Sequence, residues 1–246
     1  MSGHSKWATI HRQKGVKDAA RGNLFSKLAR NISIAVKTGG GAIAESNFKL
    51  RVAIDKAKAA NMPKENVERA IKAASGKLDI EEMTYEGFGP FGISVIVEVA
   101  SDNRNRTGQE IKNLFERAGG SLAGPGAVSF NFESKGFLLL QKDSSSDDAI
   151  LKIIDLGVEE VEETEDGIEV YVSPEKLSQV RKDLEAYGFE ILETELQMEP
   201  KSLKLITSPD QASKALSFLS TLNDHEDVQK VYANLDVPQD LIREVS

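Results

Sequence analysis

The chain has 246 residues, of which 40% are hydrophobic and 28% charged, and its formal net charge is −8. Its length suits one large domain or two to three small ones, and its composition is typical of a globular protein. It contains no run of about 18 apolar residues and no signal-like N-terminus, so we expect a cytoplasmic protein without a membrane partner. The absence of cysteine excludes disulfides, a thiolate nucleophile and a cysteine-based metal site.

Positive charge is concentrated at the N-terminus. Residues 1–78 hold sixteen Lys/Arg and five Asp/Glu, whereas residues 79–246 hold fifteen and thirty-four. Such segregation indicates two roles for the surface. We expect the basic third to meet a polyanion and the acidic remainder to limit non-specific adhesion to nucleic acid.

The first 78 residues are predicted to form a basic helical domain. Apolar residues recur with helical spacing after the N-terminal arm, and the glycines at 39–41 end this pattern. A second helix is expected to begin at Ser46 as N-cap, and a third at Pro63. The expected helices cover residues 23–41, 46–61 and 63–76.

The remaining sequence alternates strand-like and helix-like segments. We expect a strand at 93–100, a helix at 106–120 and a strand at 127–133. Residues 136–198 then read β-α-β-β-α-β, with an Asp166-Gly167 hairpin turn, which is the pattern of a ferredoxin-like sandwich. A further β-α-β follows, with its segments at 202–207, 209–224 and 227–237.

The two outer β-α-β pieces each lack partners, but together they complete a second β-α-β-β-α-β unit. The predicted fold class is therefore α+β, with an N-terminal basic helical domain followed by two ferredoxin-like domains, one inserted into the other. Three side-by-side units with half-built sheets are the alternative, which is less favoured because an isolated two-stranded unit is marginal in water. The predicted domains are residues 1–78, residues 79–133 plus 200–240, and the insert 134–199.

The N-terminal arm and the helices after it are the first candidate nucleic-acid site. An inert, solvated terminus is the alternative, but aromatic and imidazole rings interleave with the cations, which suits stacking on bases. The candidate residues are His4, Lys6, Trp7, His11, Arg12, Lys14, Lys17, Arg21, Lys27, Arg30 and Lys37.

The second candidate is the segment "SDNRNRTGQE", residues 101–110, which joins a strand end to a helix start. Such a start can bind an anion, so Arg104, Asn105 and Arg106 are candidate contacts, with Thr107 as the helix cap. Equally, the segment forms a turn whose arginines pair with surface acids, and spacing alone leaves both open. The glycine-rich stretches 87–92 and 119–126 have no phosphate-loop spacing and are read as turns.

Catalytic chemistry is not indicated. The histidines, His4, His11 and His225, stand in no metal-binding or catalytic spacing. We therefore predict no enzyme activity, no catalytic residue, no metal site and no cofactor.

Several ordered motifs carry a resemblance to a known family. They include "GHSKW" at 3–7, "DKAK" and "NMPK" in the helical domain, "YEGFGPFG" at 85–92 and "SDNRNRT" at 101–107. The chain resembles the YebC/PmpR family, which includes the mitochondrial translational activator of cytochrome c oxidase. The resemblance covers nearly the whole chain and implies a helical N-terminal domain, two α/β domains and no enzyme activity.

Three functions follow from these observations. A DNA-binding transcriptional regulator is favoured by the resemblance, although no base-reading helix-turn-helix pattern stands out. A ribosome-associated translation factor that binds RNA is the alternative, and a small-ligand-sensing α/β protein is the second alternative. Sequence specificity, target genes and oligomeric state are left open.

Overall fold

Three helices occupy the described part of the N-terminal region. The structure is a computed structural model that describes residues 18–76, 80–142, 147–164, 166–238 and 240–242. The helices are α2 (Asp18–Thr38), α3 (Phe48–Ala59) and α4 (Lys64–Ala74). They pack around a shared core in which Ile32, Leu50 and Ala57 are fully buried.

The start of α3 differs from the prediction by one residue. Asn47, not Ser46, is the N-cap, and its side-chain oxygen accepts the Leu50 N–H at 3.0 Å. Its amide nitrogen also donates to the carbonyls of Ala35 and Gly41, both at 2.7 Å. A serine hydroxyl could not span all three groups, because it is shorter and has a single donor.

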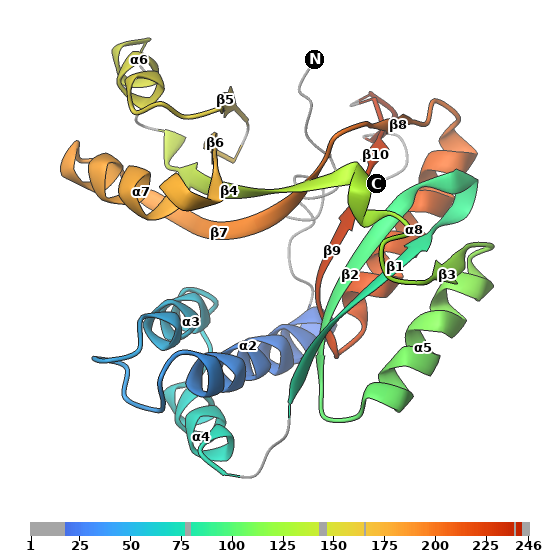
Figure 1. Cartoon of the computed structure of the whole chain (residues 1–246), viewed down its shortest axis with the longest axis horizontal. Helices are drawn as coiled ribbons and strands as arrows, with labels where there is room; N and C mark the ends of the chain where they lie inside the picture. Colours follow the sequence, from blue (N-terminus) through green and yellow to red (C-terminus); the bar gives the residue numbers. More distant parts are fainter. Residues whose placement is uncertain (1–17, 77–79, 143–146, 165, 239, 243–246) are drawn as a thin grey trace.

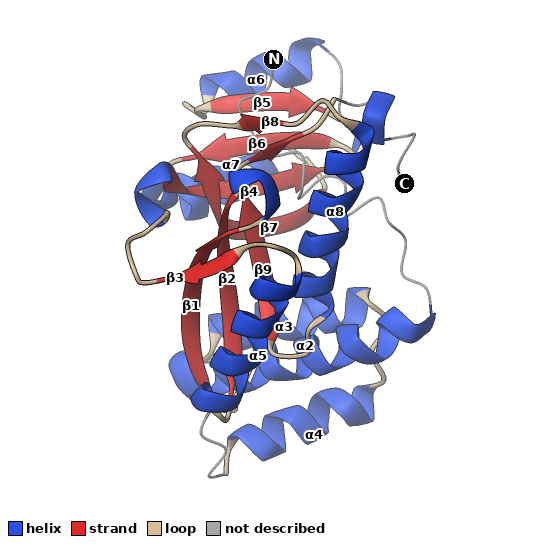
Figure 2. Cartoon of the chain, turned by 90° about the vertical axis from the view of Figure 1, so that its right-hand side faces the viewer, coloured by secondary structure: helices blue, strands red, loops and turns tan. Residues whose placement is uncertain are grey.

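The first sheet has the strand order β3-β1-β2-β9 and is antiparallel throughout. Its strands are β1 (Glu81–Phe88), β2 (Ser94–Ser101), β3 (Ser121–Ala123) and β9 (Val228–Ala233). Helices α5 (Arg104–Arg117) and α8 (Pro209–Asp224) cover one face of it (Figure 2). Phe115 of α5 and Phe218 of α8 meet edge to face at 5.1 Å between ring centroids.

Two elements of this sheet were predicted wrongly. Strand β1 is missing from the prediction, because it is largely polar and includes Gly87. The predicted strand at 127–133 is instead a loop and a 3-10 turn (Ser129–Asn131), followed by the start of the next strand. The Glu86 carboxylate accepts the N–H groups of Gly126, Val128 and Ser129 at 2.8–2.9 Å, which folds the loop around it. The alternation of apolar and polar residues at 127–133 gives no indication that a buried carboxylate from another strand binds this segment.

The second sheet lies between β3 and β9 in the sequence. Its strands are β4 (Phe132–Leu140), β5 (Glu160–Glu163), β6 (Ile168–Val172) and β7 (Ile191–Pro200), in the order β5-β6-β4-β7. Helices α6 (Asp147–Asp155) and α7 (Leu177–Ala186) complete the expected β-α-β-β-α-β order.

A short parallel pair joins β8 (Lys204–Leu205) to β10 (Leu235–Asp236), separate from both four-stranded sheets. The predicted strands at 202–207 and 227–237 therefore contribute only β9 to the first sheet.

The two glycine-rich stretches, which were expected to be turns, also contain parts of strands. Residues 87–92 include the last two residues of β1, which are followed by a 3-10 turn at Pro90–Gly92. Residues 119–126 include β3.

The mixed helix-and-sheet class, with N-terminal helices before antiparallel sheets, is confirmed (Figure 1). We retain the division into three domains, residues 1–78, residues 79–133 plus 200–240, and residues 134–199, as a proposal.

Among the described residues, no helix has the length and apolar character needed to cross a membrane.

We predict that Gly87→Ala destabilises the protein by about 1–3 kcal/mol, because an added methyl group has no space there. Its Cβ would lie 2.6 Å from Phe115 Cε1 and 2.6 Å from the Ser121 carbonyl oxygen. Urea denaturation measures the change. Gly124→Ala is the control, since nothing lies within 4 Å of its added Cβ. Equal stability of the two variants would contradict the packing described for β1.

Candidate nucleic-acid interface

Much of the predicted site lies outside the described residues. This applies to His4, Lys6, Trp7, His11, Arg12, Lys14 and Lys17, which stay a prediction. Arg21 lies near the start of α2, where the chain enters the described region.

Two predicted cations of α2 bind within the molecule. The Arg30 guanidinium forms an ion pair with Asp227 and donates to the Glu226 carbonyl at 2.8 Å. The Lys27 ammonium donates to the Asn223 carbonyl at the end of α8. Burial lowers the pKa of Lys27 to about 8, against an opposing effect of the Asp224 charge. These contacts attach α2 to the turn between α8 and β9.

The "SDNRNRT" segment binds the same carboxylate from the other side. Arg106 Nη2 lies 3.0 Å from Asp227 Oδ2, and the hydroxyls of Thr107 and Ser101 donate to that oxygen at 2.6 and 3.2 Å. The Asp227 side chain is fully buried. We call this group the Asp227 junction, and its members are Arg30, Ser101, Arg106, Thr107 and Asp227.

The surroundings of Asp227 favour its charged form. Burial alone would raise the pKa of this carboxyl. The hydrogen bonds from Thr107 and Arg106, together with the charges of Arg30 and Arg106, outweigh burial and hold the pKa below its usual value. The junction is therefore a buried charge that is satisfied by two arginines and two hydroxyls.

The start of α5 is organised for this junction. Asn103, not Thr107, caps the helix, because its side-chain oxygen accepts the Arg106 N–H at 3.1 Å. Arg106 also pairs with Asp102 at 3.2 Å and approaches Glu110 at 4.0 Å. Two interpretations of this segment were left open, and the one in which its arginines pair with acids applies to Arg106. Arg104 and Asn105 are exposed.

The helical domain also presents cations that the prediction did not name. They lie on the outer sides of α3 and α4, where helical periodicity would have placed them. The exposed residues are Lys49, Arg51, Lys58, Lys64, Arg69 and Lys72, and the predicted Lys37 is exposed as well. Lys56 differs, because it is half-buried and its ammonium lies 3.1 Å from Glu193 and 3.3 Å from Glu195 of β7.

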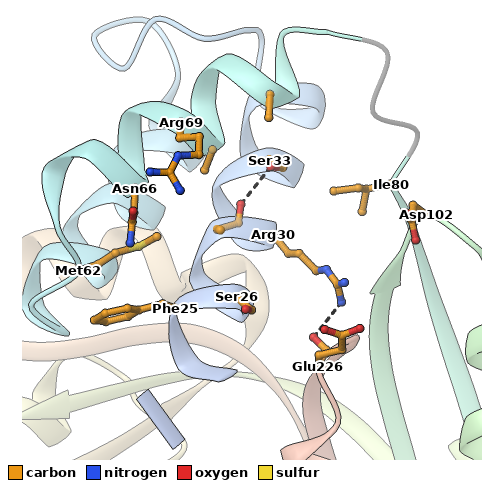
Figure 3. Close-up of a pocket in the computed structure, with 13 residues that line it drawn as sticks. Phe25, Ser26, Arg30, Ser33, Met62, Asn66, Arg69, Ile80, Asp102 and Glu226 are labelled. Carbon is orange, nitrogen blue, oxygen red and sulfur yellow. Dashed lines mark hydrogen bonds between the residues drawn. The ribbon is translucent and has the colours of Figure 1, made fainter. Parts of the chain in front are cut away.

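A pocket of about 430 Å³ lies where α2 and α4 meet the end of β2. Figure 3 shows Phe25 and Met62 on its apolar wall and Arg30 reaching across to the Glu226 carbonyl. Because the Arg30 guanidinium is already bound to the junction, we assign this pocket to the domain boundary rather than to a ligand.

Comparison with known proteins places the chain in a family. A model of the TACO1/YebC N-terminal domain matches residues 5–77, and a model of the TACO1/YebC second and third domains matches residues 80–235. The chain belongs to the TACO1/YebC family. The resemblance read from the sequence motifs is therefore confirmed.

TACO1/YebC relatives align over nearly the full chain. A protein of Dictyoglomus turgidum is 45% identical over 251 residues and covers 100% of both chains. A protein of a Geobacillus species is 46% identical over 242 residues, covering 96% of this chain and 98% of its own. Both carry the name "Probable transcriptional regulatory protein".

A solved structure has the same fold. The crystal structure of a conserved hypothetical protein from Aquifex aeolicus superposes with a TM-score of 0.85 at 41% identity. The match covers 96% of this chain and 98% of that one. In this TACO1/YebC chain, the "SDNRNRT" motif has a structural role, because its Ser101, Arg106 and Thr107 side chains bind the Asp227 carboxylate.

We predict that Asp227→Asn lowers the free energy of unfolding at pH 7 by about 3–5 kcal/mol, because it removes one partner of a buried ion pair. The folded-state pKa of this carboxyl is depressed, so its contribution is present above the unfolded pKa of about 3.9 and is lost as the pH falls through the folded value. Urea unfolding should therefore show wild type and variant converging in acid.

Asp102→Asn is the control, since this exposed carboxylate also pairs with Arg106. Its loss should cost less than about 1 kcal/mol. An Asp227→Asn variant as stable as Asp102→Asn, or a difference from wild type that persists at low pH, would refute the role given to Asp227.

Proposed function

We propose that the chain is a nucleic-acid-binding regulator of gene expression that acts in the cytoplasm and binds duplex DNA through its N-terminal third. The observation that carries this proposal is the excess of sixteen Lys/Arg over five Asp/Glu in residues 1–78 of an acidic protein. The names of the relatives, which describe probable transcriptional regulators, support it. We propose no catalytic role.

The Asp227 junction narrows the proposed interface. Lys27, Arg30 and Arg106 hold the domains together, so we leave them out of it. The interface then consists of the arm, Arg21 and the exposed cations of the helical domain, with Arg104 and Asn105 at its edge. The cations of α3 and α4 suit this task, because the ion pairs of Lys58 with Asp55 at 3.4 Å and of Lys64 with Glu68 at 3.6 Å are exposed. Such pairs contribute little and exchange readily for phosphate.

Contacts of this type position a protein on the phosphate backbone but read little sequence. If about six cations meet phosphates, the logarithm of the binding constant should fall with the logarithm of salt concentration at a slope of roughly −5. A titration of duplex DNA across salt concentrations measures this slope, and a slope near zero would exclude a phosphate-binding surface.

We predict that the triple variant Lys14→Glu, Lys17→Glu and Arg21→Glu loses binding to duplex DNA at physiological salt while its melting temperature stays near that of wild type. The control makes the same charge change in the sheet domains, at exposed Lys112, Lys204 and Lys214. It should bind as wild type does. Retained binding in the N-terminal triple variant would move the interface elsewhere.

RNA on the ribosome is the competing target. Purified protein can be offered one promoter duplex, an unrelated duplex and ribosomes together at physiological salt. Selectivity of about a thousandfold for one duplex supports specific DNA regulation. Weak, sequence-independent duplex binding with co-sedimentation on ribosomes would replace the DNA proposal with a translation factor.

A further inference from the structure

The connection between α2 and α3 leads into an exposed aromatic side chain. Phe48, the first residue of α3, is 60% exposed, and Ile43 in the connection is 64% exposed. Figure 1 shows this connection at the left edge of the molecule. The contacts described above between the helical domain and the sheets are made elsewhere, by Lys27, Arg30 and Lys56. The surface around Phe48 is therefore open to a partner.

The core of the helical domain is formed by other side chains of α2, α3 and α4, such as Ile32 and Leu50. Phe25 and Phe48 are the aromatic residues of segment 18–76, and Phe25 packs against that core. Single exposed apolar side chains are common on protein surfaces, so exposure alone assigns no function to Phe48. Two further features do, namely the support of its ring and the charge around it.

The backbone at Phe48 is fixed by the residue before it. Asn47 is fully buried, and its side chain caps α3 while it also binds the carbonyls of Ala35 and Gly41. Gly39 packs so closely on Asn47 that it has no space for a side chain. The start of α3 is therefore anchored to the end of α2, and the position of Phe48 on the surface is defined by these contacts.

A guanidinium group supports the ring of Phe48. The Arg51 Cζ atom lies 5.7 Å from the centre of this ring, within the range of a cation–π contact. Arg51 Nη1 donates to the carbonyls of Ala44 and Glu45 at 2.8 and 2.6 Å, which ties the guanidinium to the connection before α3. An aromatic group that is ordered before binding loses less conformational entropy when a ligand stacks on it.

Positive charge predominates around Phe48. Residues 37–51 contain Lys37, Lys49 and Arg51 but one acid, Glu45. The side chains of Lys49 and Arg51 are exposed, and the Lys49 ammonium makes a long hydrogen bond of 3.4 Å to the Thr38 hydroxyl. An exposed aromatic ring between exposed cations is suited to a nucleic-acid strand, because the cations bind phosphates while the ring stacks on a base.

The chemistry of the ring selects the kind of nucleic acid that it can bind. The phenylalanine side chain has no hydrogen-bonding group, so it cannot hydrogen-bond to the edges of base pairs in a groove. In a fully paired duplex, neighbouring bases cover the faces of each base. Where a base is unpaired and leaves the stack, its face becomes available, and an aromatic side chain can stack on it.

We propose that Phe48, supported by Arg51, stacks on an unpaired base of the bound nucleic acid, while Lys49 binds a neighbouring phosphate. This inference deepens the proposed nucleic-acid binding and rests on it. Phosphate contacts position a protein without distinguishing paired from unpaired strands. The stacking contact adds that distinction, because it is formed only where the duplex is bulged, mismatched or locally melted.

Fluorescence anisotropy with two labelled DNA duplexes tests this contact, one fully paired and one with a short bulge of unpaired bases. We expect wild type to prefer the bulged duplex. Phe48→Ala should weaken binding to the bulged duplex about tenfold and binding to the paired duplex less than about twofold. Tyr187→Ala is the control and should bind both as wild type does, because Tyr187 is a 59% exposed aromatic at the end of α7.

Two further variants separate stacking from a general apolar contact. Phe48→Trp should keep the preference for the bulged duplex, because it retains a flat aromatic ring. Phe48→Leu should lose the preference, since leucine is apolar but not flat. Melting temperatures near that of wild type show that each variant is folded.

Equal effects of Phe48→Ala on the two duplexes, or a wild type without preference between them, would overturn the stacking contact and leave the proposed DNA binding intact. An RNA duplex with the same bulge distinguishes the source of the base. A tenfold loss on bulged RNA but not on bulged DNA supports the contact and assigns the base to RNA. If wild type binds neither the DNA nor the RNA, the proposed function is refuted and the stacking contact with it.

Discussion

A single buried carboxylate holds the two ends of this fold together. Asp227 precedes β9 and has no exposed surface, so its charge must be met within the protein. Arg30 meets it from the helical domain, and Arg106 with two hydroxyls meets it from the helix start after β2. This ion-pair cluster is therefore a main determinant of how the basic helices lie relative to the acidic sheets, beside the contacts of Lys27 and Lys56.

This constraint divides the positive charge of the N-terminal third into two classes. Lys27, Arg30 and Lys56 bind carbonyls and carboxylates of the sheet domains and so fix the arrangement of the molecule. The cations on the outer sides of α3 and α4 face solvent, where they can exchange their partners. A net-charge count cannot separate the classes, because it treats a structural arginine and a ligand-binding arginine alike.

The sequence predicted the helices well, since their apolar periodicity is strong: α8 begins and ends at the expected residues. It failed where a polar side chain organises the backbone. Glu86 turns the expected strand at 127–133 into a loop, and Asn47 and Asn103 cap their helices in place of the expected Ser46 and Thr107. It also could not show that residue 30 and residue 227 meet, because nothing in the local pattern at either position marks a long-range ion pair.

The most direct test of this account is a double-mutant cycle between Arg30 and Asp227 in urea unfolding. The single variants Arg30→Gln and Asp227→Asn and the double variant give the coupling free energy of the pair. The account predicts a coupling of about 1–3 kcal/mol at pH 7, because the two side chains contact each other in a buried network. A coupling near zero would mean that the helical domain is not held to the sheets through Asp227, and would contradict the account.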